Sequence, residues 1–246
     1  MQHKIGIIGF GNMGSAIAEQ LKNNYKVMVF EKDSAKTAKA SGILVAKDLS
    51  ALIRDSDTLI LAVKPQDFPQ VFLEIKDSGH ELDKLVISIA AGIPTTYIEE
   101  HFGVVRVIRV MPNIPAKINA GMICLTKGKF ASEEDLDFAQ ELFDYLGETL
   151  IIKEELMDEV TATSGSGPGF ICRILHLQHI DPNDEVAISN FEKEFIPSFT
   201  ASAEEIGIPK EKAEILVSAT TAGTIALLRT SHMTPEQLEK QVVSKK

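Results

Sequence analysis

The chain has 246 residues, of which 44% are hydrophobic and 24% charged, and its formal net charge at pH 7 is −10. The length allows one large domain or two smaller ones. A mean hydropathy near zero, without an apolar run of the ~20 residues that a spanning helix needs, excludes a membrane protein. The acidic balance argues against nucleic acids and anionic membranes as partners. The first residues show no secretory leader pattern, so we expect a cytoplasmic protein.

The first predicted elements surround a glycine-rich turn. Residues 4–14 read KIGIIGFGNMG, which fills all three glycine positions of G-x-G-x-x-G between a β-branched strand and a helix pattern over residues 15–21. The first glycine permits a tight turn, the second lets the backbone approach a diphosphate, and the third allows close helix packing. The helix start then offers free N–H groups to the phosphates. A tight turn without a ligand is the alternative. We predict that a dinucleotide contacts Gly9, Phe10, Gly11, Asn12, Met13 and Gly14.

Glu31 follows a second predicted strand, residues 26–30. A carboxylate in this place usually accepts hydrogen bonds from the adenosine ribose and repels a 2′-phosphate, which favours NADH over NADPH. Lys32 and Ser34 weaken that preference, because both side chains can contact a phosphate. The alternative is a solvated turn in which Asp33 caps a short helix.

Strand and helix patterns alternate up to about residue 150, which is typical of a parallel sheet flanked by helices. Asp48 and Ser132 stand where helix caps are expected. The predicted helices cover residues 34–40, 49–54, 66–76, 94–100 and 133–146, and the predicted strands cover residues 43–46, 58–63, 84–89, 104–110, 122–125 and 149–152.

Strand patterns stop near residue 154. Predicted helices then cover residues 154–163, 190–206, 210–229 and 235–243, and the sequence SGSGPG at residues 164–169 interrupts the first of them. We therefore predict an α/β protein with a Rossmann-type dinucleotide-binding domain, residues 1–153, followed by an all-α dimerisation domain, residues 154–246. Small residues on the long helix suit either a dimer core or packing within the chain: Ser218, Ala219, Ala222, Gly223 and Ala226.

Several polar residues are left out of the predicted site. Cys124 and Cys172 lack metal-type spacing and are expected to be reduced packing residues. The six histidines show no ligand spacing, so we expect no metal, and His176 and His179 are predicted to lie on the surface. The alternation of Arg106 and Arg109 with valines predicts the polar face of a strand.

Separated segments of the chain carry a family resemblance. In chain order they are IGIIGFGNMGSAI (5–17), LAVKPQ (61–66), SIAAGI (88–93), VIRVMPNIPA (107–116), VTATSGSGPGF (160–170) and TPEQLEKQVVSK (234–245). Together they resemble pyrroline-5-carboxylate reductases, the enzymes that make L-proline. The combination spans essentially the whole chain and is specific, although the glycine fingerprint alone is not.

The resemblance implies positions for the coenzyme and the substrate. The segment Ala62, Val63, Lys64 and Pro65 would line the nicotinamide side of the coenzyme site, with Lys64 as a merely structural cation in the alternative view. Asn113 would contact the nicotinamide or the substrate, or else fix the turn before Pro115. The glycine-rich segment would approach the substrate or serve as a kink between domains. The implied substrate contacts are Asn113, Ser166, Gly167 and Ser244.

The reaction implied is hydride transfer from NADH or NADPH to the C=N carbon of a small cyclic imine carboxylate. The sequence shows no catalytic triad or carboxylate pair, so no catalytic side chain is assigned. The family's glycine–threonine loop, whose N–H groups would hold the substrate carboxylate, should begin where this chain stops at Lys246. A second departure is an extra segment, residues 171–189, which we expect to be a surface loop or, alternatively, to restructure the domain's first helix.

The leading hypothesis is therefore an NAD(P)H-dependent pyrroline-5-carboxylate reductase that assembles as a homodimer or a ring of dimers. One alternative is a dinucleotide-binding dimer without catalysis, because its substrate loop is missing. The other is a different small hydroxyacid or imine reductase, which would need a catalytic lysine in the helical domain. The stretch 201–228 offers only Lys210 and Lys212, both beside a helix start.

Overall fold

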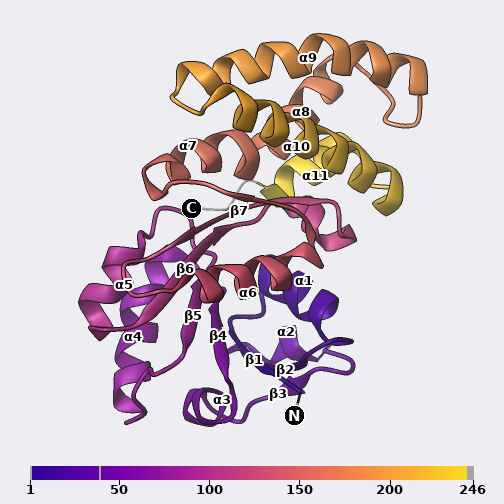
Figure 1. Ribbon diagram of the computed structural model, residues 1–246. Coiled ribbons are helices and arrows are strands. Elements are labelled where there is room, and N and C mark those ends of the chain that lie inside the picture. Colours follow the sequence, from indigo (N-terminus) through magenta and orange to yellow (C-terminus); the bar gives the residue numbers. More distant parts are fainter. Residues whose placement is uncertain (1, 39, 243–246) are drawn as a thin grey trace. The chain divides into compact units, whose positions relative to one another are not determined.

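The computed structural model describes residues 2–38 and 40–242 (Figure 1). Within them, eight strands form one sheet in the order β3-β2-β1-β4-β5-β6-β7-β8. The neighbours from β3 to β6 pair in parallel, and Ile5 of β1 lies beside Val27 of β2 and Thr58 of β4. The predicted parallel sheet is confirmed. The strands are β1 (Lys4–Ile8), β2 (Lys26–Phe30), β3 (Leu44–Val45), β4 (Thr58–Leu61), β5 (Leu85–Ser88), β6 (Arg106–Met111), β7 (Gly121–Lys127) and β8 (Gly147–Ile151).

The chain divides into two compact units, and each is discontinuous in sequence. The first unit comprises Met1–Val110 and Leu125–Tyr145. The second comprises Met111–Cys124 and Leu146–Lys246. The single boundary that we predict between residues 153 and 154 stays a prediction.

The helices of the first unit start at the predicted caps. The Asp48 carboxylate accepts a hydrogen bond from the Ala51 N–H at 2.7 Å, and Ser132 and Asp135 form a capping box. Leu52, Phe72 and Ile98, from three different helices, share one apolar core with strand residues of the sheet. The helices are α1 (Asn12–Leu21), α2 (Ser34–Thr37), α3 (Leu49–Asp55), α4 (Phe68–Asp77), α5 (Thr95–Phe102) and α6 (Glu133–Asp144).

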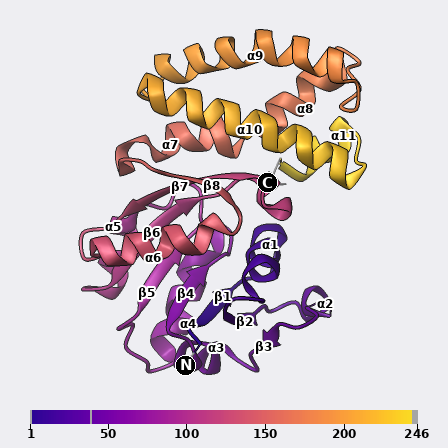
Figure 2. The same cartoon turned by 45° about the vertical axis from the view of Figure 1, so that its right-hand side comes forward.

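The second unit is mainly helical, as predicted, although the glycine-rich segment does not end its first helix. A π-helical turn, Thr161–Gly165, leads from α7 into α8, where Pro168 stands in the first turn and so breaks no helical hydrogen bond. Helices α9 and α10 lie side by side in both views of the chain (Figures 1 and 2). The helices are α7 (Met157–Val160), α8 (Gly167–Leu177), α9 (Glu185–Glu205), α10 (Lys210–Ser231) and α11 (Pro235–Val242).

The extra segment is helical at both ends, over residues 171–177 and 185–189, with a turn over residues 178–184 between them. The predicted surface loop is therefore wrong for most of the segment, which extends helices α8 and α9. Helix α8 continues to residue 177, and α9 begins at residue 185 because the Asp184 carboxylate accepts hydrogen bonds from two N–H groups at 3.0 Å. Ile171 and Leu175, spaced one helical turn apart, are buried with Ile188 in one apolar cluster. The segment therefore forms part of the core of this unit.

The small residues of α10 divide between two environments. A Cβ added at Gly223 would lie 2.1 Å from the Ala120 carbonyl oxygen, so this glycine allows a close contact within the unit. Ser218 and Ala222 are exposed instead. Of the two alternatives, packing within the chain is therefore confirmed for Gly223. Ser218 and Ala222 are exposed and available for a contact with a second chain.

The two strand arginines do not share a polar face. Arg109 is only 3% exposed, whereas Arg106 is exposed and lies 2.7 Å from an oxygen of Asp135. Residues three apart in a strand point to opposite faces, so the predicted common face was wrong.

The predicted packing role of the cysteines is confirmed. Cys124 and Cys172 are buried and form no disulfide, and burial raises the pKa of each thiol to about 12. His176 and His179 are exposed, as predicted. In the described ranges, no group of three or more His, Cys, Asp or Glu residues is placed to hold a metal ion.

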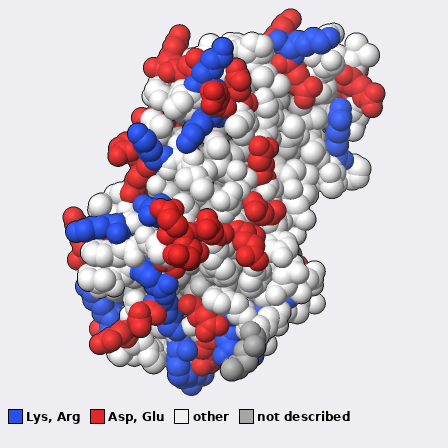
Figure 3. Space-filling model, in the orientation of Figure 1, with Lys and Arg blue, Asp and Glu red and all other residues white. Residues whose placement is uncertain are grey.

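No helix in the described part of the chain is long and apolar enough to cross a membrane. On the face drawn in Figure 3, Lys and Arg side chains are scattered among Asp and Glu side chains and do not gather in one area. The whole chain has 35 acidic and 25 basic residues.

Candidate dinucleotide-binding site

The three glycines of the fingerprint have different surroundings. Gly9 adopts φ +100°, its N–H donates to the Phe30 carbonyl at 2.8 Å, and an added Cβ would lie 2.6 Å from the Ala62 carbonyl oxygen. A Cβ at Gly14 would lie 2.3 Å from the Gly9 carbonyl oxygen. Gly11, by contrast, has no such neighbour within 4 Å. The protein's own backbone therefore requires the first and third glycines, while the second borders open space.

Helix α1 begins directly after that space. Gly11 is its N-cap residue, and no described side chain caps the helix or places an acidic group in its first turn. The first N–H groups of a helix have no partner within the helix, and its N-terminal end carries a positive partial charge. The predicted contact residues Asn12 and Met13 stand in this first turn, and Phe10 is buried just before it. The geometry suits a bound diphosphate.

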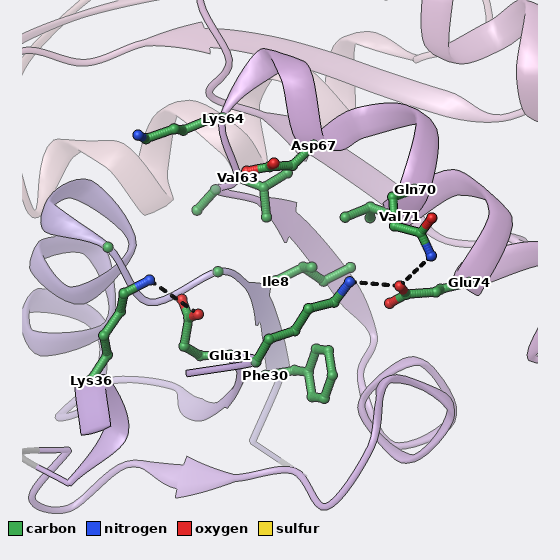
Figure 4. Close-up of a pocket in the computed structure, with 14 residues that line it drawn as sticks. Ile8, Phe30, Glu31, Lys36, Val63, Lys64, Asp67, Gln70, Val71 and Glu74 are labelled. Atoms are coloured by element: carbon green, nitrogen blue, oxygen red, sulfur yellow. Dashed lines mark hydrogen bonds and ion pairs between the residues drawn. The ribbon is translucent and has the colours of Figure 1, made fainter. Parts of the chain in front are cut away.

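A cleft of about 280 Å³ adjoins the glycine turn (Figure 4). Its walls come from the ends of β1, β2 and β4, from α2 and from α4. Among the predicted coenzyme contacts, Pro65 follows the cleft-lining Lys64 and starts a short 3-10 turn before α4. The residues lining the cleft are Ile8, Gly9, Gly11, Phe30, Glu31, Lys32, Lys36, Ala62, Val63, Lys64, Asp67, Gln70, Val71 and Glu74.

Glu31 is fixed at the end of β2 by three donors. Its carboxylate accepts the Phe10 N–H at 2.9 Å, the Asp33 N–H at 3.1 Å and the Lys36 ammonium at 3.2 Å. Burial alone would raise the pKa of Glu31, but these hydrogen bonds outweigh it and hold the pKa below its ordinary value. The helix cap of the alternative interpretation is Asp33, which accepts the Ala35 N–H at 3.1 Å. Glu31 itself lines the cleft.

A second ion pair lines the cleft, and it was not predicted from the sequence. Lys32 Nζ lies 2.6 Å from Oε1 of Glu74 on α4, and Gln70 Nε2 donates to the same oxygen at 2.8 Å. Figure 4 shows Glu31 with Lys36 on one side and Glu74 with Gln70 on the other. The cleft lining contains three acidic side chains and three basic ones, so their formal charges cancel.

Asn113 lies in a buried polar network of the second unit. Its Oδ1 accepts the Met122 N–H at 2.9 Å, and its Nδ2 donates to Ser164 Oγ at 3.2 Å. The Thr220 hydroxyl donates to Ser164 Oγ at 3.0 Å. These bonds tie the start of the 113–122 segment to β7 and to the residues around Ser164. The predicted roles of Asn113, a contact with the nicotinamide or the substrate or a fixed turn before Pro115, stay predictions.

The other predicted substrate residues stay predictions. Ser166 is half-buried at the start of α8, and Gly167 is buried beside it, where an added Cβ would lie 2.8 Å from Thr220 Cγ2. Ser244 lies outside the described residues.

Two family models match separate parts of the sequence, one near each end. Residues 4–92 match the model for "NADP oxidoreductase coenzyme F420-dependent" proteins, and residues 190–246 match the model for pyrroline-5-carboxylate reductase dimerisation.

Individual relatives match over more of the chain. The pyrroline-5-carboxylate reductase of Aquifex aeolicus is 30% identical over 98% of this chain and 84% of its own length. That of Methanosarcina acetivorans is 41% identical over 70% of this chain and 67% of its own. A crystal structure of Plasmodium falciparum pyrroline carboxylate reductase with NADP bound is 27% identical, with a TM-score of 0.62, over 98% of this chain and 85% of that one.

Proposed function

The chain belongs to the pyrroline-5-carboxylate reductase family, and we propose that it reduces 1-pyrroline-5-carboxylate to L-proline with a hydride from a nicotinamide coenzyme. The proposal rests on the open space at Gly11. Of the three fingerprint glycines, Gly11 is the one at which an added Cβ would have no protein neighbour within 4 Å. A coenzyme diphosphate fits there against the N–H groups of α1. When bound, the reduced nicotinamide supplies the hydride.

The residues of the cleft then hold and orient the coenzyme. We propose that the Glu31 carboxylate accepts hydrogen bonds from the adenosine ribose, since it is ionised and already fixed at the end of β2. Ala62 and Val63 follow β4 and line the cleft, so they are placed to contact the nicotinamide half. The carboxyl ends of parallel strands are where open α/β sheets bind such ligands.

The decisive experiment is a turnover assay on the native full-length protein. We expect pyrroline-5-carboxylate to cause loss of reduced-nicotinamide absorbance and L-proline to appear in equal amount. A small keto acid should give no such loss. If the imine carboxylate is not reduced with either NADH or NADPH, the proposed function is wrong.

We further propose that NADH is preferred over NADPH. Replacing Glu31 by Ser should shift the ratio of the two dissociation constants toward NADPH by about tenfold, because a charged hydrogen-bond acceptor for the ribose is lost and a repulsive charge is removed. Titration followed by coenzyme fluorescence measures both constants. Glu100→Ser, an exposed change on α5, is the matched control. Equal ratios in Glu31→Ser and wild type would contradict the ribose contact.

The match to the dimerisation model supports self-association of the chain. We propose a homodimer, or a ring of dimers, that covers the exposed small residues Ser218 and Ala222 of α10. Small side chains allow the backbones of two helices to approach closely, which suits a helical interface.

A further inference from the structure

We propose that Glu74 is a positioning residue for coenzyme choice: it holds Lys32 in an ion pair and so withholds that lysine from the 2′-phosphate of NADPH. This inference rests on the proposed function, because it concerns the same coenzyme cleft. It adds to Glu31 a second carboxylate, from the opposite wall of the cleft, that excludes the phosphorylated coenzyme.

The contacts of Lys32 point to this role. Lys32 directly follows Glu31, so its side chain leaves the backbone at the end of β2. The ribose of a bound coenzyme is expected at this strand end. Its side chain is 58% exposed, yet Nζ lies 2.6 Å from Glu74 Oε1 across the cleft. Gln70, one helical turn before Glu74 on α4, donates to the same oxygen at 2.8 Å and so orients the carboxylate.

The ion pairs of the cleft support the same role for Glu74. Lys36, the other lysine of the β2–α2 region, is held by Glu31 at 3.2 Å. Both lysines that follow β2 therefore already have a carboxylate partner from the cleft lining. A phosphate monoester brings a charge of about −1.5 to −2 at neutral pH. It would have to displace one of these carboxylates and would be repelled by both, whereas the ribose hydroxyl of NADH meets neither obstacle.

The test is Glu74→Gln in the full chain, which keeps the shape of the side chain and removes its charge. Dissociation constants for NADPH and NADH are measured by coenzyme fluorescence without imine substrate. We expect NADPH to bind about fivefold to tenfold more tightly and NADH to change by less than about twofold, because one freed charge pair near the surface contributes on the order of 1 kcal/mol. The gain should shrink as ionic strength rises.

A second variant shows whether the effect passes through Lys32. In Lys32→Met/Glu74→Gln the gain for NADPH should disappear, since no freed ammonium remains. Glu133→Gln is the control, because Glu133 has an equally short ion pair with Lys127, 2.6 Å, but does not line the cleft. It should leave both constants unchanged.

The remaining outcomes overturn the inference. An unchanged NADPH constant in Glu74→Gln, an equal change for both coenzymes, or a gain that persists without Lys32 would each do so. If wild-type protein binds neither coenzyme, the inference and the proposed function are both wrong. If wild type binds and reduces the imine while Glu74→Gln keeps the wild-type ratio, only the inference fails.

Discussion

A Gly11→Val variant is expected to fold like the wild type and to lose affinity for both NADH and NADPH by about tenfold to 100-fold, from a steric cost of ~1–3 kcal/mol. A Cβ at Gly11 would have no protein neighbour within 4 Å beyond the adjacent residues of the chain, so we expect the new side chain to fit without a clash. It would instead occupy the space proposed for the coenzyme diphosphate. Gly11 has φ −77° and ψ −162°, an extended conformation that valine adopts readily. Coenzyme titration measures the loss, and thermal unfolding checks the fold.

The matched control is Ala201→Val, an exposed change on α9 that should alter neither affinity nor melting temperature by much. A Gly11→Val protein that binds coenzyme as tightly as wild type would show that the diphosphate lies elsewhere. Loss of binding accompanied by an equal loss of stability would show that the glycine serves the fold and not the ligand.

Gly14→Ala, unlike Gly11→Val, is expected to lower the free energy of unfolding, by ~1–3 kcal/mol. The added Cβ would lie 2.3 Å from the Gly9 carbonyl oxygen, which belongs to the backbone of the turn and cannot rotate away. Helix α1 would have to move off the β1–α1 turn, so coenzyme binding should weaken as well. Urea unfolding measures the change.

Ser15→Ala, one residue further along α1, removes only a hydroxyl that donates to the Asn12 carbonyl at 3.2 Å and serves as the control. Alanine is a better helix former than glycine, so the substitution would stabilise α1 if the added Cβ met no clash. A Gly14→Ala protein at least as stable as wild type would therefore mean that α1 moves away from Gly9 at no cost in free energy. The steric argument for the third glycine would then be wrong.

Local signals in the sequence predict most of the fold. The caps at Asp48 and Ser132 each involve residues within three positions of one another, so they can be recognised without knowing the fold. The central strands β4 and β5 are fully buried and mainly apolar, as is typical of a parallel sheet. The three glycines of the fingerprint are likewise close together in sequence, which is why the turn at Gly9 could be predicted.

Features that depend on partners far along the chain could not be predicted. The pairing of Lys32 with Glu74 joins residues 42 positions apart, and nothing near Glu74 in the sequence marks it as a wall of the coenzyme cleft. The burial of Arg109 was missed because arginine is read as polar wherever it stands. Helix α8 was missed because the histidines and charges around residues 176–185 obscured the apolar spacing of Ile171 and Leu175.

The interleaving of the two units means that no single cut yields two self-sufficient halves of this protein. The chain passes from the first unit to the second after Val110, returns after Cys124 and leaves again after Tyr145. A fragment that ended at residue 153 would keep Asn113 but lack Ser164 and Thr220, the hydroxyl groups that surround its amide. An unsatisfied amide in such a setting costs about 1–3 kcal/mol. Two separately produced halves would therefore have to reassemble before this amide regains its partners. A circular permutant keeps all of these residues in one chain, whereas a truncation removes some of them.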